Sequence, residues 1–316
     1  MMIHTPVLLD EVLKTLDNIS GKTIIDCTFG AGGYSRAFLA AGANVIAFDR
    51  DPSVISHAEK LTHEYGDRFT FINEPFSKIG SILSSPPVEG YGEAGGWSCT
   101  DLKSKTTPPF GHPSIGGELI SAIVFDLGIS SMQIDTPERG FSWRFDAPLD
   151  MRMGVSVGVS ASELIQNSTA EELIRILKIY GDVKNAGAIA RAMKDTLPTT
   201  TFELKELIYN PKDYGNVFQA LRIAANDEMG EIEAAMNAVP EILAPDGICI
   251  AVTFHSLEDR LIKNIFREWT TTPGDARMPT VASAPFKLLK TYTPSDTEIQ
   301  NNPRARSAHL RATKKI

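Results

Sequence analysis

One stretch near the start of the chain constrains its fold more than any other. Residues 23–26 form an apolar run that ends in Asp26, and a glycine-rich turn over residues 29–35 follows at once. A second apolar run leads to Asp49, at the spacing of about 20 residues that is typical of a nucleotide-binding βαβ unit. Glycine has no Cβ atom, so such a turn bends tightly and its backbone N–H groups approach a ligand. The pattern predicts a site for an adenosine compound, with Asp49 on the ribose hydroxyls.

Two adenosine cofactors fit this unit. A dinucleotide site usually has a third glycine at the helix start and holds a pyrophosphate there, whereas this chain has Ser35. S-adenosyl-L-methionine carries no phosphate, and Asp26 beside the loop can bind its amino group. The residues favour S-adenosyl-L-methionine. NAD with dehydrogenase chemistry is the alternative, and an ordinary strand-to-helix turn also explains the glycines.

Composition sets the class of protein. The 316 residues include 42% hydrophobic and 22% charged residues, enough for a large core and about two domains. No apolar run approaches the ~20 residues that span a bilayer, and no signal-peptide pattern is evident, so we expect a cytoplasmic protein. Cys27, Cys99 and Cys249 lie in no paired spacing, which predicts neither disulfides nor a metal site.

Charge is unevenly distributed along the chain. The formal net charge is −8, yet residues 285–316 hold seven Lys/Arg and two acidic residues, a local +5 that leaves −13 for the rest. A basic segment of this kind fits either a nucleic-acid-binding surface or a solvated tail.

The order of elements predicts a doubly wound, Rossmann-like α/β sheet. Expected strands over residues 45–48, 69–72 and 120–125 alternate with expected helices over 35–41 and 53–61. Residues 84–118 are rich in Pro, Gly and Ser, and we expect a long, mobile surface loop there.

A helical pattern interrupts the strands for about a hundred residues. Capping boxes are predicted at Ser168 with Glu171 and at Thr200 with Glu203, and a long helix over 217–239. The strand pattern resumes over residues 248–254. We therefore expect an inserted all-helical domain over 135–235, between two parts of a sheet domain at 1–134 and 236–316.

Two residues with side chains able to accept or donate protons lie at the ends of apolar strands. Asp126 ends one predicted strand and His255 follows the last one, so both should lie at the carboxyl edge of the sheet, where ligands bind in open α/β folds. An acid there can accept a proton from a substrate amine or fix the cofactor. Residues 139–144 interleave arginine with Phe141 and Trp143, which fits either stacking of an extruded base or a packed interdomain hinge.

Motifs spread along the whole chain resemble a known family. They lie at residues 4–9, 28–33, 49–52, 126–131, 139–142, 148–153, 218–223, 254–260 and 302–304. Together they are similar to the bacterial 16S rRNA cytosine-N4 methyltransferases of the MraW type, and only the 84–118 segment falls outside the resemblance.

The resemblance implies a function and a site. It implies methyl transfer from S-adenosyl-L-methionine to the exocyclic N4 of one cytidine in the decoding centre (P-site region) of 16S rRNA in the small ribosomal subunit, with the helical domain recognising the substrate. Asp126 is the first candidate to accept the amine hydrogen bond and His255 the second. The implied cofactor-binding residues are Gly32, Gly33, Tyr34, Asp49, Phe76, Asp126 and Gln133. A catalytically silent ribosome-assembly factor is a further alternative, and a homodimer is an open possibility.

The chain departs from the family pattern at several positions, including Tyr180–Val183, which replace a more acidic pair. Ala31 and Tyr34 stand where the family usually has arginine and histidine, which removes side-chain contacts to the methionine carboxylate from those positions. Residues 214–216 replace an Ala-Thr-Arg sequence and with it a possible phosphate contact.

Overall fold

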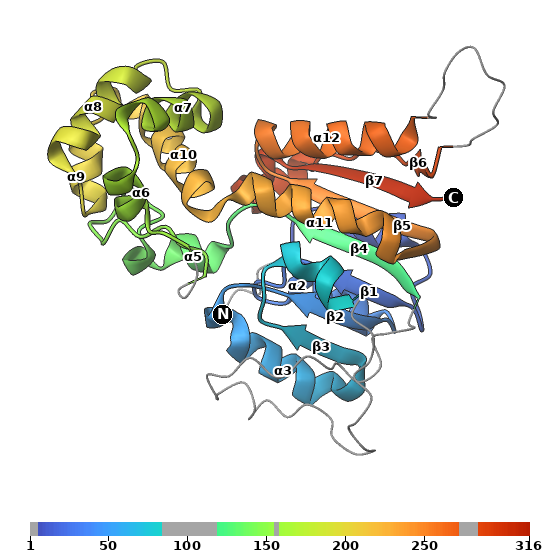
Figure 1. Ribbon diagram of the computed structural model, residues 1–316. Coiled ribbons are helices and arrows are strands. Elements are labelled where there is room, and N and C mark those ends of the chain that lie inside the picture. Colours follow the sequence, from blue (N-terminus) through green and yellow to red (C-terminus); the bar gives the residue numbers. More distant parts are fainter. Residues whose placement is uncertain (1–5, 84–118, 155–157, 272–283) are drawn as a thin grey trace, which may run out of the picture. The chain divides into compact units, whose positions relative to one another are not determined.

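The computed structural model describes residues 6–83, 119–154, 158–271 and 284–316 (Figure 1). The chain divides into two compact units. We call residues 1–128 with 231–316 the sheet unit, and residues 129–230 the helical unit. The predicted segment 84–118, with Cys99, lies outside the described residues. In the part of the chain that the structure describes, no helix is long and apolar enough to cross a bilayer.

A seven-stranded sheet forms the centre of the sheet unit, in the order β3-β2-β1-β4-β5-β7-β6. Strands β1 to β5 run parallel, and β7 pairs antiparallel with both β5 and β6. The strands are β1 (Thr23–Asp26), β2 (Asn44–Phe48), β3 (Phe69–Ile72), β4 (Ile120–Asp126), β5 (Leu243–Thr253), β6 (Phe286–Leu288) and β7 (His309–Lys315). The predicted doubly wound, Rossmann-like α/β fold is confirmed.

Helices cover both faces of this sheet, so its central strands are apolar on both sides. Ile24, Ile123 and Val124 are completely buried, as are Cys27 and Cys249, both free thiols. The helices of this unit are α1 (Leu9–Leu16), α2 (Gly33–Ala40), α3 (Ile55–Tyr65), α4 (Ile79–Leu83), α11 (Glu228–Ile242, mostly in this unit), α12 (Ser256–Thr270) and α13 (Asp296–Asn301).

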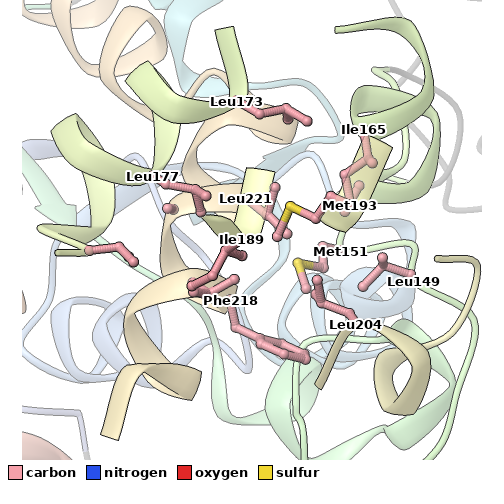
Figure 2. Packing of buried hydrophobic residues seen from close by; sticks show 14 of the residues in the cluster. Leu149, Met151, Ile165, Leu173, Leu177, Ile189, Met193, Leu204, Phe218 and Leu221 are labelled. Atoms are coloured by element: carbon pink, nitrogen blue, oxygen red, sulfur yellow. The ribbon is translucent and has the colours of Figure 1, made fainter. Parts of the chain in front are cut away.

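The helical unit has a hydrophobic core of its own. Figure 2 shows Leu173 and Leu177 of one helix converging with Met193 and Leu221 of two others, and each is fully buried. Apolar residues spaced three or four apart place one stripe of each helix on this core. The helices are α5 (Ser131–Asp135), α6 (Ala161–Asn167), α7 (Ala170–Gly181), α8 (Ala186–Thr196), α9 (Thr201–Glu206) and α10 (Tyr214–Asn226).

One predicted helix start was wrong by a residue. The helix predicted from Ser168 and Glu171 is capped instead by Thr169, whose Oγ1 accepts from the backbone N of Glu172 at 3.2 Å. Glu172 Oε2 in turn accepts from the backbone N of Thr169 at 2.7 Å. Two overlapping Ser/Thr-x-x-Glu patterns occur here, and sequence spacing cannot choose between them. The predicted box of Thr200 with Glu203 is confirmed.

The single long helix predicted over residues 217–239 was also wrong. The chain breaks at Asp227, which adopts a left-handed conformation with φ of 47° between α10 and α11. The amide of Asn226 stabilises this end, because its Oδ1 accepts from Met153 N at 2.8 Å and its Nδ2 donates to Met151 O at 2.7 Å. These long-range bonds, unlike helical periodicity, are invisible in the local sequence.

Gly140 gives a test of the helical unit. It has φ of +72°, and a Cβ atom there would lie 2.2 Å from the carbonyl oxygen of Pro148. We expect Gly140→Ala to lower the free energy of unfolding by the left-handed cost of about 1–2 kcal/mol plus an overpacking cost of about 1–3 kcal/mol. Urea denaturation followed by circular dichroism measures the change.

Gly21 is the matched control for this prediction. Its φ of +71° is nearly the same, but a Cβ atom would meet no heavy atom within 4 Å. Gly21→Ala should therefore show the left-handed cost alone. Equal destabilisation by the two variants would contradict the packing argument.

Candidate active site

Asp26 holds the glycine loop at both ends. It is the last residue of β1 and is completely buried. Its Oδ1 accepts from Thr28 N at 3.2 Å and its Oδ2 accepts from Ser35 Oγ at 2.7 Å. Burial raises the pKa of Asp26 to about 6, although these hydrogen bonds act in the opposite direction. The carboxylate proposed from the sequence for the cofactor amine therefore lies beneath the loop and shapes it.

Asp49 follows β2 and contacts the same loop. Its Oδ2 accepts from Gly30 N at 2.8 Å and its Oδ1 accepts from Asp51 N at 2.9 Å. The residue is partly exposed. Burial of the carboxyl group raises its pKa to about 6, and the charges of Asp51 and Asp26 add to this. A carboxylate oxygen accepts more than one hydrogen bond, so Asp49 keeps capacity for hydroxyl donors.

Asp126 ends β4, the strand beside β1. Its backbone N donates to Thr28 Oγ1 at 2.7 Å, which ties the strand end to the glycine loop. Its Oδ1 is buried and has no hydrogen-bond partner among the described residues. Burial raises its pKa well above the usual value, and the charges of Asp26 and Glu258 raise it further. Buried acceptors are usually hydrogen-bonded. A bound ligand can supply the donor that Oδ1 of Asp126 lacks.

The charge of this edge discriminates between the two cofactors. Asp26, Asp49 and Asp126 end or follow adjacent parallel strands, and Asp26 raises the pKa of both others by like-charge repulsion. A positively charged sulfonium and an ammonium group relieve that repulsion, whereas an anionic pyrophosphate increases it. The residues present fit S-adenosyl-L-methionine and disfavour NAD.

Gly32 and Gly33 are glycines for reasons of packing. A Cβ on Gly32, whose φ is +79°, would lie 2.9 Å from the ring of Phe29. A Cβ on Gly33 would lie 2.5 Å from Cγ of Pro6. Gly33 and Tyr34 begin α2, where backbone N–H groups lack intrahelical acceptors. A ligand at this helix start would meet the backbone N–H groups of Gly33 and Tyr34.

The side chain of Tyr34 is committed to the core. Its hydroxyl donates to the carbonyl oxygen of Val7, and its ring stacks on Phe38 with centroids 6.0 Å apart. Burial raises the pKa of the Tyr34 hydroxyl well above the usual value. Of the predicted contacts of Tyr34, only the backbone N–H is compatible with this packing.

Phe76 and Gln133 lie in different units. Phe76 follows β3, is partly exposed and packs edge-on against Phe125 with centroids 5.8 Å apart. Gln133 belongs to the helical unit and is 6% exposed. Its Oε1 accepts from Ser130 N at 3.0 Å in the capping box of α5.

His255 caps α12 just after β5. The predicted alignment is confirmed, because β5 pairs with β4 in parallel and places Val252 opposite Asp126. The Nδ1 atom of His255 accepts from the backbone N of Glu258 at 3.4 Å, and Glu258 Oε2 accepts from Phe254 N at 2.8 Å. The Nε2 atom lies 2.9 Å from Glu258 Oε1 but out of line for a hydrogen bond.

The two aromatic residues proposed for base stacking pack within the helical unit. Phe141 is 8% exposed and belongs to the core, with the Arg139 guanidinium 5.7 Å from its ring centroid. Trp143 is half-buried and lies edge-on to Phe218 at 5.8 Å. Packing thus accounts for Phe141, while Trp143 retains exposed surface.

Sequence reasoning missed Thr28 and Glu258. Thr28 connects Asp26 to Asp126, and Glu258 is a completely buried acid beside His255. The Glu at the third position after a helix cap was a usable signal for Glu258. No local pattern distinguished Thr28.

Comparisons with known proteins relate this chain to one family. The model of the MraW methylase family matches residues 1–316. Ribosomal RNA small subunit methyltransferase H of Chelativorans sp. (strain BNC1) is 40% identical and aligns with 99% of this chain and 87% of its own length. The protein of the same name from Rickettsia bellii is 38% identical, with 99% of each chain covered.

A solved rRNA methylase from Streptococcus thermophilus covers 100% of this chain and 99% of its own, with a TM-score of 0.40 and 12% identity. The family is established by the sequence matches. The chain belongs to the MraW methylase family, and S-adenosyl-L-methionine, the cofactor predicted from its sequence, is confirmed.

Proposed function

We propose that this chain methylates the exocyclic N4 of a cytidine in the decoding centre of 16S rRNA. Ribosomal RNA as the substrate class follows from the name that the relatives share, ribosomal RNA small subunit methyltransferase H. An amine is proposed as the target because Oδ1 of Asp126, at the carboxyl edge of the sheet, is buried and has no hydrogen-bond partner among the described residues. An amine N–H is the donor that this oxygen lacks.

The chemistry of N4 explains why an acceptor is needed. The lone pair of the cytosine amine is delocalised into the ring, so N4 is a weak nucleophile. A hydrogen bond from N4–H to Asp126 favours the pyramidal form, in which the lone pair is available for in-line attack. S-adenosyl-L-methionine supplies an electrophilic methyl group on a positively charged sulfur. Because N4 lies on the pairing edge, the cytidine must be unpaired or flipped.

The proton leaves after the methyl group has arrived. The methylated amine carries a positive charge and is acidic, so a carboxylate of moderate basicity is sufficient to accept its proton. Burial raises the pKa of Asp126 and makes its ionised form more basic.

His255 is better suited to positioning than to accepting this proton. Its Nδ1 lone pair already accepts the backbone N–H of Glu258. In the neutral ring that bond places the proton on Nε2, which is then a donor. We assign Asp126 as the proton acceptor and His255 as the cap that fixes the start of α12.

The remaining cofactor contacts follow the strand ends. Asp49 accepts hydrogen bonds from the ribose hydroxyls, and Phe76 contacts the adenine. The methionine end is contacted by the backbone of Gly32, Gly33 and Tyr34. Gln133 and the homodimer stay predictions from the sequence, as do the domain boundaries at 134/135 and 235/236.

Replacing Asp126 with asparagine tests its role as the proton acceptor. Asp126→Asn keeps the size of the side chain but cannot take up the proton, so we expect kcat at saturating cofactor to fall by about 10²–10⁴-fold. The measurement is mass mapping of N4-methylcytidine after incubation with unmethylated 30S subunits.

His255→Asn is the paired variant, because asparagine is a good helix cap. It should retain kcat within about tenfold of the parent. The reverse pattern, a silent Asp126 variant and an inactive His255 variant, would assign the proton transfer to His255. Normal cofactor binding with no methylation by the parent protein would instead indicate a catalytically silent assembly factor.

The raised pKa of Asp49 predicts pH-dependent cofactor binding. Ribose hydroxyls donate to the ionised carboxylate, which predominates above pH of about 6 and is lost below it. We expect the dissociation constant of S-adenosyl-L-methionine to be nearly constant from pH 6.5 to 7.5. Below pH of about 6 it should rise up to about tenfold per unit. Isothermal titration calorimetry measures it.

Asp49→Asn is the control. It should bind more weakly at neutral pH and lose most of the rise below pH 6. Persistence of the full pH dependence in this variant would show that another group, such as Asp26 with its similar pKa, controls binding.

A further inference from the structure

One face of α12 carries mostly basic and neutral side chains, bordered by Glu268, the only exposed acid of this helix. Arg260, Lys263, Asn264 and Arg267 are exposed and recur every three or four residues, so they lie on one side of the helix. From Arg260 to Arg267 the helix rises about 10 Å. We call Arg260, Lys263 and Arg267 the α12 stripe.

The positive charge of this stripe is not neutralised by its own helix. Arg260 and Lys263 form no ion pair with any residue that the structure describes, and Arg267 donates to the neutral Asn264. The acids in the first turn are occupied elsewhere. Glu258 is buried, and Asp259 accepts two bonds from Arg311 of β7, at 2.7 and 2.9 Å. Those bonds hold the pKa of Asp259 below its usual range.

The stripe begins at the edge that holds the proposed site. The helix starts after His255, at the same carboxyl edge as Asp126, and packs against β5, β6 and β7 (Figure 1). The antiparallel pairing of Thr253 with His309 brings the start of β7 to this edge. Exposed Arg306, in the turn just before β7, adds a further cation there.

On this chain a polyanion can bind only where positive charge is concentrated locally. The chain carries a net charge of −8, and its helical unit holds 11 Lys/Arg and 14 Asp/Glu residues, a net −3. Neither the net charge of the chain nor that of the helical unit attracts RNA. A basic stripe that leads away from the reaction edge supplies the attraction where a strand must enter.

We infer that the α12 stripe binds the phosphates of the RNA strand that delivers the target cytidine to the edge holding Asp126. The inference rests on the proposed function, because it takes RNA as the substrate. Phosphate contacts of this kind position a strand without reading its sequence. The stripe therefore sets affinity and orientation, and the reacting atoms are left to other residues.

Neutralising two members of the stripe tests this. Arg260→Gln with Lys263→Gln should weaken binding of a fluorescein-labelled single-stranded RNA and of unmethylated 30S subunits. Two lost phosphate contacts should reduce the slope of log K against log salt by about 1.4. The KM for 30S subunits should rise about fivefold or more at about 100 mM salt, with kcat unchanged. Fluorescence anisotropy and initial rates measure these quantities.

Lys14→Gln with Lys60→Gln is the matched control, because it removes two exposed positive charges from α1 and α3. It should keep the parental slope and KM. Calorimetry with S-adenosyl-L-methionine should give parental affinity for both double variants and so report an intact fold.

Three outcomes overturn the inference. They are an unchanged slope in the α12 variant, an equal loss in the control, or stronger competition by polyglutamate than by RNA, which would indicate an acidic protein partner. The proposed function can fail while this inference holds. In that case the slope of log K for RNA against log salt falls in the α12 variant as expected, but the unmutated protein methylates an atom other than cytidine N4.

Discussion

A buried carboxylate at the end of β1 determines the rest of the site. Asp26 binds both ends of the glycine loop, and Thr28, which it positions, binds the backbone of Asp126. The loop, the strand end and the proposed proton acceptor therefore form one connected network. Burying Asp26 concentrates negative charge at the carboxyl edge, and that charge favours a cationic cofactor over a phosphorylated one.

The sequence predicted the five parallel strands because their signals are local. It missed β6 and β7 in the basic segment over residues 285–316, so the strand before His255 is not the last one. Apolar runs, glycines and acids at strand ends identified the fold and the strand-end positions of Asp49, Asp126 and His255. Long-range bonds decided what it could not predict. The break at Asp227 depends on Asn226 contacts to residues about 75 positions away, and the core position of the Tyr34 hydroxyl depends on Val7.

The site also shows that one side chain can serve folding and function together. His255 replaces the usual Ser, Thr, Asp or Asn at the start of a helix, and this use of Nδ1 limits the proton chemistry available to the ring. Glu258 completes the cap while its charge raises the pKa of Asp126. A helix start thereby contributes to the electrostatics of a neighbouring strand.

The helical unit is inserted between two strands that pair directly. The chain leaves the sheet after β4 and returns through α11 to β5, whose Val252 stands opposite Asp126. The sheet therefore needs nothing from the insert to complete its hydrogen bonds. Changes of sequence or length in the insert therefore leave the strand pairing beneath the proposed site intact, which makes this connection a natural point at which to exchange or shorten the insert.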